Sequence, residues 1–135
     1  MKNISAISNR VLIADDDAVV RRVLAATIVN AGYIPVEAAD GREAFRILQR
    51  DSDFKAAIFD WLMPHLTGLD LVTYMATEKR LQRIPSMLIT ADGNLSVMTQ
   101  SFLAGAVAYL PKPFTAEQAQ TAMRMLLAKR RQLAA

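Results

Sequence analysis

The sequence contains no cysteine and a single histidine, His65. Without thiols the chain can form neither a disulfide framework nor a thiolate metal site, and one histidine makes a transition-metal site a weak prediction. No apolar run approaches the roughly 18 residues of a membrane-spanning helix, and the beginning, MKNISAISNR, lacks the apolar segment of a signal peptide. These absences suit a reducing compartment, and we expect a cytoplasmic location without membrane contact.

A concentrated run of positive charge is also missing, although the net charge is +3 and the isoelectric point lies near 9.5. The longest basic run, Lys129 to Arg131, is expected in the last turn of a helix, where the dipole favours cations. This scatter argues against direct nucleic-acid binding. With 135 residues, 53% of them hydrophobic, we expect a single domain over residues 1–135, with a core from about 10 to 131.

Short apolar segments alternate along the chain with segments of helical periodicity. Strands are predicted at 10–14, 33–37, 56–60, 86–90 and 107–110, and Pro35 is most easily accommodated at a sheet edge. Predicted helices begin after Asp17, at Asp40 and Gly41, over 69–80, after Asn94, and after Thr115, which forms a capping box with Gln118. This alternation predicts an α/β fold, a doubly wound parallel sheet of five strands with five crossover helices.

Acidic residues follow two of the predicted strands. Asp15 and Asp16 come directly after the first, and Asp60 ends the third, within the segment Ala56 to Gly68. In the strand order 2-1-3-4-5 these two strand ends lie side by side at the topological switch point. Three converging carboxylates repel one another, so one takes up a proton or a cation lies among them. Magnesium, which prefers carboxylate and water oxygens, is the predicted ion.

Two further strand ends add a hydroxyl group and a cation to the same edge. Thr90 closes the fourth strand and Lys112 follows the fifth. A metal, an ammonium and a hydroxyl together suit a phosphoryl group, with Asp60 as its nucleophile. Each residue alone has an ordinary explanation as a helix cap, a strand residue or a solvated surface residue. Their appearance at the ends of four strands is harder to explain in that way.

Five segments of the chain strongly resemble the receiver domain of two-component response regulators, of the kind found alone in chemotaxis regulators. These segments are VLIADDD (11–17), AADGREA (38–44), IFDWLMPHLTG (58–68), MLITA (87–91) and AYLPKPF (108–114). The resemblance implies a flavodoxin-like fold and a signalling domain rather than an enzyme, which assists its own phosphorylation and dephosphorylation. It also implies a cis peptide between Lys112 and Pro113.

The same resemblance assigns roles to individual residues. It implies that Asp60 is the phosphoacceptor and that Mg²⁺ is held by Asp15, Asp16, Asp60 and the backbone carbonyl of Leu62. Lys112 is then the phosphate-binding cation. Thr90 is the switch hydroxyl and Tyr109 the switch aromatic. The implied phosphodonor is a sensor histidine kinase or a histidine phosphotransfer protein. A downstream protein, an output domain or a second copy would contact the fourth helix, fifth strand and last helix, including Leu95, Met98, Phe102 and Tyr109.

Other functions remain open at this stage. A magnesium-dependent phosphohydrolase commonly has a second aspartate two residues after its nucleophile, where this chain has Leu62. A nucleotide-binding module would have a glycine-rich turn after the first strand instead of three aspartates. A receiver fold acting independently of phosphorylation stays possible, and Tyr109 has an alternative as an ordinary half-buried strand tyrosine. Leu62 and Asp92 are hypothesised to set the lifetime of an acyl phosphate.

Overall fold

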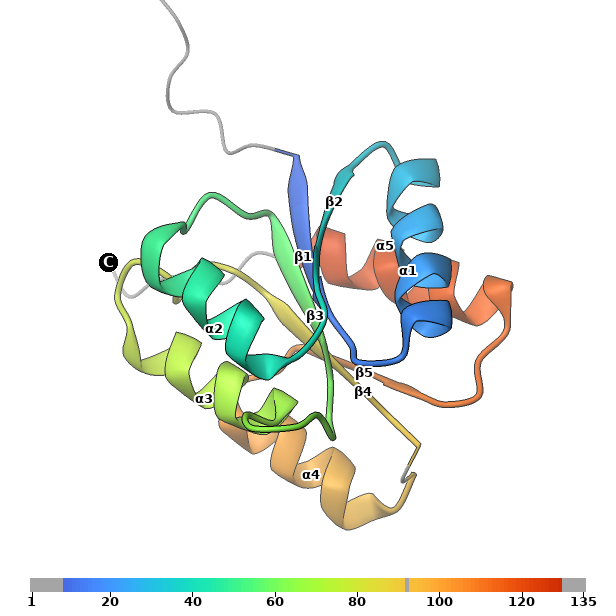
Figure 1. Ribbon diagram of the computed structural model, residues 1–135. Helices are drawn as coiled ribbons and strands as arrows, with labels where there is room; N and C mark the ends of the chain where they lie inside the picture. Colours follow the sequence, from blue (N-terminus) through green and yellow to red (C-terminus); the bar gives the residue numbers. More distant parts are fainter. Residues whose placement is uncertain (1–8, 92, 130–135) are drawn as a thin grey trace, which may run out of the picture.

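The computed structural model describes residues 9–91 and 93–129 (Figure 1). One parallel sheet has the strand order β2-β1-β3-β4-β5. Its strands are β1 (Arg10–Ala14), β2 (Ile34–Ala38), β3 (Ala56–Asp60), β4 (Ser86–Thr90) and β5 (Ala108–Pro111). The helices of the described part are α1 (Ala18–Asn30), α2 (Gly41–Arg50), α3 (Gly68–Thr77), α4 (Leu95–Ala104) and α5 (Ala116–Ala128). The predicted fold class and strand order are confirmed.

Helices cover both faces of the sheet, with α1 and α5 on one side and α2, α3 and α4 on the other (Figure 1). Successive side chains of a strand point to opposite faces. Val11 and Ile13 therefore join the cluster under α1 and α5, whereas Leu12 and Ala14 join the cluster under the other three helices. The side chains of each apolar strand are thus shared between two separate hydrophobic cores, one on each face of the sheet.

The central strands are more deeply buried than the edge strand β2. Every residue of β3 and β4 is buried, while β2 at the edge leaves Ile34 58% exposed. Pro35 lies in β2, as expected, because a proline has no N–H to donate to a second neighbouring strand. Helices therefore cover both faces of β1, which leads into Asp15, and of β3, which ends at Asp60.

Side-chain caps begin the helices as the sequence predicts. Asp17 accepts hydrogen bonds from the N–H groups of Val19 and Val20, and Asn94 accepts one from Val97. Thr115 and Gln118 form the predicted capping box. A second capping box, between Thr67 and Asp70 at the start of α3, was not predicted. It begins α3 at Gly68, directly after the loop that follows β3.

Several predicted boundaries are wrong. Helix α3 ends at Thr77 rather than at residue 80, because the chain then turns to bury Leu81 and Ile84 in the core. Strand β2 begins one residue late, since the N–H of Tyr33 donates to the carbonyl of Ile28 in the turn that ends α1. Strand β5 is also displaced by one residue, to 108–111.

The end of α5 also differs from the prediction. Helix α5 stops at Ala128 and Lys129 is its C-cap residue, so no basic residue occupies its last turn. Residues 130 and 131, the rest of the basic run and of the predicted core, lie outside the described residues. Among the described helices, none has the length and apolar character needed to cross a membrane.

Candidate functional site

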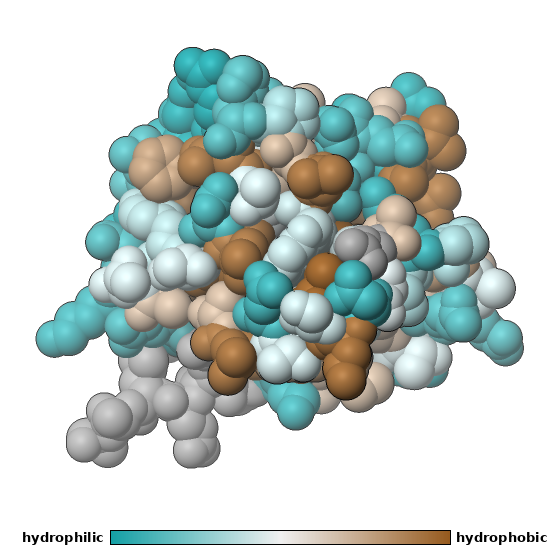
Figure 2. Space-filling model, turned by 90° about the horizontal axis from the view of Figure 1, so that it is seen from below, coloured by the Kyte–Doolittle hydropathy of each residue, from teal (hydrophilic) through white to brown (hydrophobic). Residues whose placement is uncertain are grey.

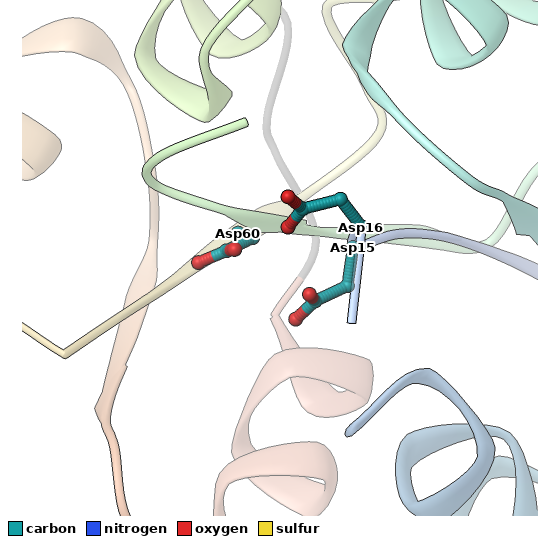
Figure 3. Close-up of side chains that lie close together, drawn as sticks. All are labelled: Asp15, Asp16 and Asp60. Atoms are coloured by element: carbon teal, nitrogen blue, oxygen red, sulfur yellow. The ribbon is translucent and has the colours of Figure 1, made fainter. Parts of the chain in front are cut away.

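The carboxyl ends of the strands, at the lower edge of the sheet in Figure 1, carry the acidic residues. Asp15 and Asp16 follow β1, and Asp60 is the last residue of β3 (Figure 3). One carboxylate oxygen from each of the three residues lies within 4.8 Å of the others. Asp15 is fully buried and Asp60 is 7% exposed, whereas Asp16 faces solvent. The structure therefore brings the three predicted aspartates together, with one side open.

Lys112 supplies a positive charge to this cluster from the segment that follows β5. Its Nζ lies 3.3 Å from Oδ2 of Asp15 and 3.3 Å from Oδ1 of Asp60. The backbone N–H of Lys112 donates to the carbonyl of Thr90 at 2.7 Å, and the Lys112–Pro113 peptide is cis, as predicted. Lys112 thus contacts the ends of three strands, with its ammonium group at Asp15 and Asp60 and with its backbone at Thr90.

Burial and charge change the acidity of the groups in this cluster. Burial, reinforced by the negative charge of Asp15, raises the pKa of Asp60 to about 6, although Lys112 acts in the opposite direction. For Lys112, burial lowers the pKa, but the nearby charges of Asp15 and Asp60 outweigh it and raise the pKa overall. Lys112 is therefore a cation at neutral pH, and ionised Asp60 is destabilised until more positive charge is present.

The donor set fits a hard divalent cation. Oδ2 of Asp15 is buried and makes no hydrogen bond of acceptable geometry within residues 9–91 and 93–129, although Nζ of Lys112 is nearby. In the described part of the chain, three carboxylates face the one ammonium group of Lys112, so the cluster carries excess negative charge when all three are ionised. Carboxylate oxygens are the ligands that Mg²⁺ prefers, and it keeps several waters, for which the open side at Asp16 leaves room.

Backbone contacts hold Asp60 in place. The N–H of Trp61 donates to the carbonyl of Ile89 at 2.6 Å, and the N–H of Gly68 donates to the carbonyl of Trp61 at 3.1 Å. A Cβ on Gly68 would collide with the carbonyl of Asp60 and lie 2.6 Å from Cδ2 of Leu88. Gly68 is thus required by space, a role that sequence reasoning missed. The only signal was a glycine at the end of the segment that contains Asp60.

The remaining predicted residues lie around the cluster. Thr90 ends β4 and is 2% exposed, and Tyr109 is half-buried on β5, where it pairs with Leu88. Leu62, two residues after Asp60, is 71% exposed, and His65 is exposed with a positive φ of 73°. Figure 2 views this end of the molecule and shows separate hydrophobic side chains among polar ones. The predicted effect of Asp92 concerns a residue outside the described ranges.

Comparison with known proteins gives consistent matches. A family model described as response regulator receiver domain matches residues 11–124. Chemotaxis protein CheY1 of Helicobacter pylori is 34% identical over 119 residues, which cover 87% of this chain and 96% of that protein. The structure of chemotaxis protein CheY4 of Vibrio cholerae superposes with a TM-score of 0.80 at 30% identity, over 90% of this chain and 100% of that one.

A more distant structure shares the fold. It is the receiver domain of a sensor histidine kinase from Pseudomonas aeruginosa, with a magnesium ion coordinated in its active-site cleft. Its TM-score is 0.78 at 24% identity, over 90% of this chain and 99% of that chain. Because the family model covers most of the chain and a chemotaxis relative is 34% identical across 87% of it, this protein belongs to the response regulator receiver domains, the phosphoacceptor signalling domains of two-component systems.

Proposed function

We propose that Asp60 accepts a phosphoryl group from the phosphohistidine of a sensor histidine kinase or a histidine phosphotransfer protein. The observation that carries the proposal is the position of its carboxylate, buried at a strand end, 3.3 Å from Nζ of Lys112 and beside two further aspartates. In the transfer, a carboxylate oxygen of Asp60 attacks phosphorus. The phosphorus–nitrogen bond breaks, and the imidazole nitrogen leaves with its electron pair and takes up a proton.

Magnesium is the proposed cofactor. Asp15, Asp16 and Asp60, with the backbone carbonyl of Leu62, would hold it, and the ion would neutralise charge on the phosphoryl oxygens when bound. The magnesium ion in the cleft of the Pseudomonas receiver domain supports this assignment. The N–H of Asp17 donates to Oδ1 of Asp15 at 2.9 Å, and this hydrogen bond would help to orient the Asp15 carboxylate for the ion.

Lys112 and Thr90 have complementary proposed roles. Lys112 lies between two carboxylates and, as a cation, would pair with a phosphoryl oxygen on Asp60. Thr90, buried at the end of the neighbouring strand, would donate its hydroxyl hydrogen to another phosphoryl oxygen. Its movement, followed by that of Tyr109, would shift the domain between two states.

The proposed output surface consists of α4, β5 and α5. Exposed apolar side chains on its helices support this choice: Leu95, Phe102, Leu103 and Met125. A downstream protein, an output domain or a second copy would bind there, without direct contact to nucleic acid or a membrane. The proposed phosphodonors act in the cytoplasm, so the proposal includes a cytoplasmic location.

Intact mass spectrometry tests the phosphoacceptor directly. We expect incubation with acetyl phosphate and Mg²⁺ to add one phosphoryl group, and we expect none with EDTA or in Asp60→Ala. Asp53→Ala, which removes an exposed carboxylate elsewhere, serves as the matched control and should be labelled like the wild type. Labelling that persists in Asp60→Ala would refute the assignment of Asp60. A folded, Mg²⁺-binding wild type that is never labelled would favour the phosphorylation-independent module.

A further inference from the structure

Arg21 contacts the acidic cluster through the protein backbone. It lies in the second turn of α1, and its Nη1 donates to the backbone carbonyl of Asp15 at 2.7 Å. Its Nε donates to Oε1 of Glu37, on β2, at 3.0 Å. The side chain of Arg21 is only 19% exposed. From sequence it counted only as one of several scattered basic residues.

The carbonyl of Asp15 belongs to the peptide that joins Asp15 to Asp16. Because a peptide unit is planar, a hydrogen bond to its oxygen orients both neighbouring residues together. The side chain of Asp15 has its own partners, since the N–H of Asp17 donates to Oδ1 and Lys112 lies beside Oδ2. Arg21 therefore contacts the backbone of the cluster rather than its side chains. Its hydrogen bond influences the direction in which the chain leaves β1.

Glu37 in turn holds Arg21. Glu37 pairs with Ile13 in the sheet register, so its position relative to the end of β1 is set by the β1–β2 ladder. The planar guanidinium can donate to two acceptors at a fixed angle, which an ammonium group cannot reproduce. Charge-assisted hydrogen bonds of this kind are also stronger than neutral ones. The side chain thus connects α1, β2 and the turn that carries Asp15 and Asp16.

We propose that Arg21 is a positioning residue for the metal site, which orients the Asp15–Asp16 peptide so that both carboxylates converge with Asp60. This inference rests on the proposed function in that the site must bind Mg²⁺. It does not depend on which donor phosphorylates Asp60, or on whether Asp60 is phosphorylated at all.

Two effects of Arg21 on Mg²⁺ affinity have opposite signs. If Arg21 acted only through its charge, it would repel Mg²⁺, and removing it would tighten binding. If Arg21 positions the two carboxylates, removing it weakens binding, and Arg21→Lys weakens binding too although the charge is kept. The direction of the change therefore separates the two explanations.

The test is a Mg²⁺ titration followed by the fluorescence of Trp61, which is next to Asp60 and half-buried, and by calorimetry. We expect Arg21→Ala to raise the dissociation constant about tenfold, the size found for residues that orient metal ligands. Arg21→Lys should weaken binding in the same direction. Glu37→Gln, which keeps the acceptor oxygen, should bind nearly as the wild type does. Arg22→Ala is the matched control, because Arg22 is the exposed neighbour on the same helix.

Unchanged or tighter Mg²⁺ binding by Arg21→Ala would overturn the inference, as would an Arg21→Lys variant that binds like the wild type. Urea unfolding in EDTA separates folding from positioning. If Arg21→Ala lost stability while its folded form kept full Mg²⁺ affinity, the role would be structural and the inference wrong. A wild type that binds Mg²⁺ in an Arg21-dependent manner but is never phosphorylated would refute the proposed function alone.

Discussion

At Asp60, burial and the charge of the neighbouring Asp15 act in the same direction on the pKa, and the charge of Lys112 acts against them. The Asp60 side chain is almost inaccessible to solvent and lies close to two other carboxylates, and among residues 9–91 and 93–129 the cation that pairs with it is Lys112. Its pKa of about 6 expresses the net result, which is that the ionised form is destabilised in the folded protein without metal. The same property makes a bound cation favourable.

The raised pKa of Asp60 predicts how stability without metal depends on pH. Between the ordinary value of 3.8 and about 6 the folded state binds more protons than the unfolded state, so the free energy of unfolding falls as pH rises. Asp60→Asn removes this loss and should be more stable than the wild type by about 1–2 kcal/mol at pH 7.5, allowing for solvent screening. Urea unfolding in EDTA from pH 4 to 8 measures it. A difference that did not vary with pH would contradict the prediction.

At the scale of elements, the junction between β3 and α3 determines where Asp60 lies. Strand β3 ends at Asp60, the chain leaves the sheet, and α3 begins again at Gly68 under its own capping box. Gly68 has no unusual φ, so its importance is not conformational freedom but the close approach of two backbones. The first residue of α3, Gly68, packs directly against the backbone carbonyl of Asp60.

Gly68→Ala should therefore destabilise the protein. Its Cβ would meet backbone, which cannot move aside as a flexible side chain can, and overpacking of this kind costs about 1–3 kcal/mol. Higher helix propensity offsets up to about 1 kcal/mol of that loss. We expect a net loss of about 1–2 kcal/mol in urea unfolding, together with weaker Mg²⁺ binding.

Gly93→Ala is the control for that substitution. Gly93 is exposed, and a Cβ added to it would meet no atom within 4 Å, so its replacement should change stability by less than about 0.5 kcal/mol. Equal effects of the two alanine substitutions would show that steric contact at Gly68 is not the cause.

At the scale of the whole molecule, the site joins strands that are brought together only by folding. If Mg²⁺ is held by the residues after β1 and at the end of β3, as proposed, it should bind the folded state and not the unfolded chain. Ligand binding of this type stabilises by about 2.7 kcal/mol when the free ligand reaches 100 times its dissociation constant. Magnesium should therefore raise the free energy of unfolding, whereas NaCl of equal ionic strength should not.

Asp16→Asn should remove most of that stabilisation. Asp16 faces solvent, so the substitution is expected to leave the metal-free protein close to the wild type in stability. Chemical unfolding of both proteins with MgCl₂ and with NaCl provides the comparison. A variant stabilised by Mg²⁺ as much as the wild type would exclude Asp16 from the metal site.

Much of this architecture could be predicted because its determinants are local. The period of apolar residues identified five strands and five helices, and capping side chains such as Asp17 and Asn94 located helix starts. The boundaries that depend on packing or on turn hydrogen bonds were less predictable. The end of α3 depends on where Leu81 and Ile84 enter the core, and the start of β2 depends on the hydrogen bond of Tyr33 to Ile28.

The fold class and the types of residue at the strand ends follow from the amino-acid sequence alone, because hydrophobic periodicity and side-chain chemistry are properties of neighbouring residues. The short distances that turn these residues into a site depend instead on tertiary packing. Three contacts join segments from different elements. Lys112 lies between two carboxylates, Gly68 packs against the carbonyl of Asp60, and Arg21 donates a hydrogen bond to the carbonyl of Asp15. Such contacts depend on how helices pack on the sheet, which no local pattern specifies.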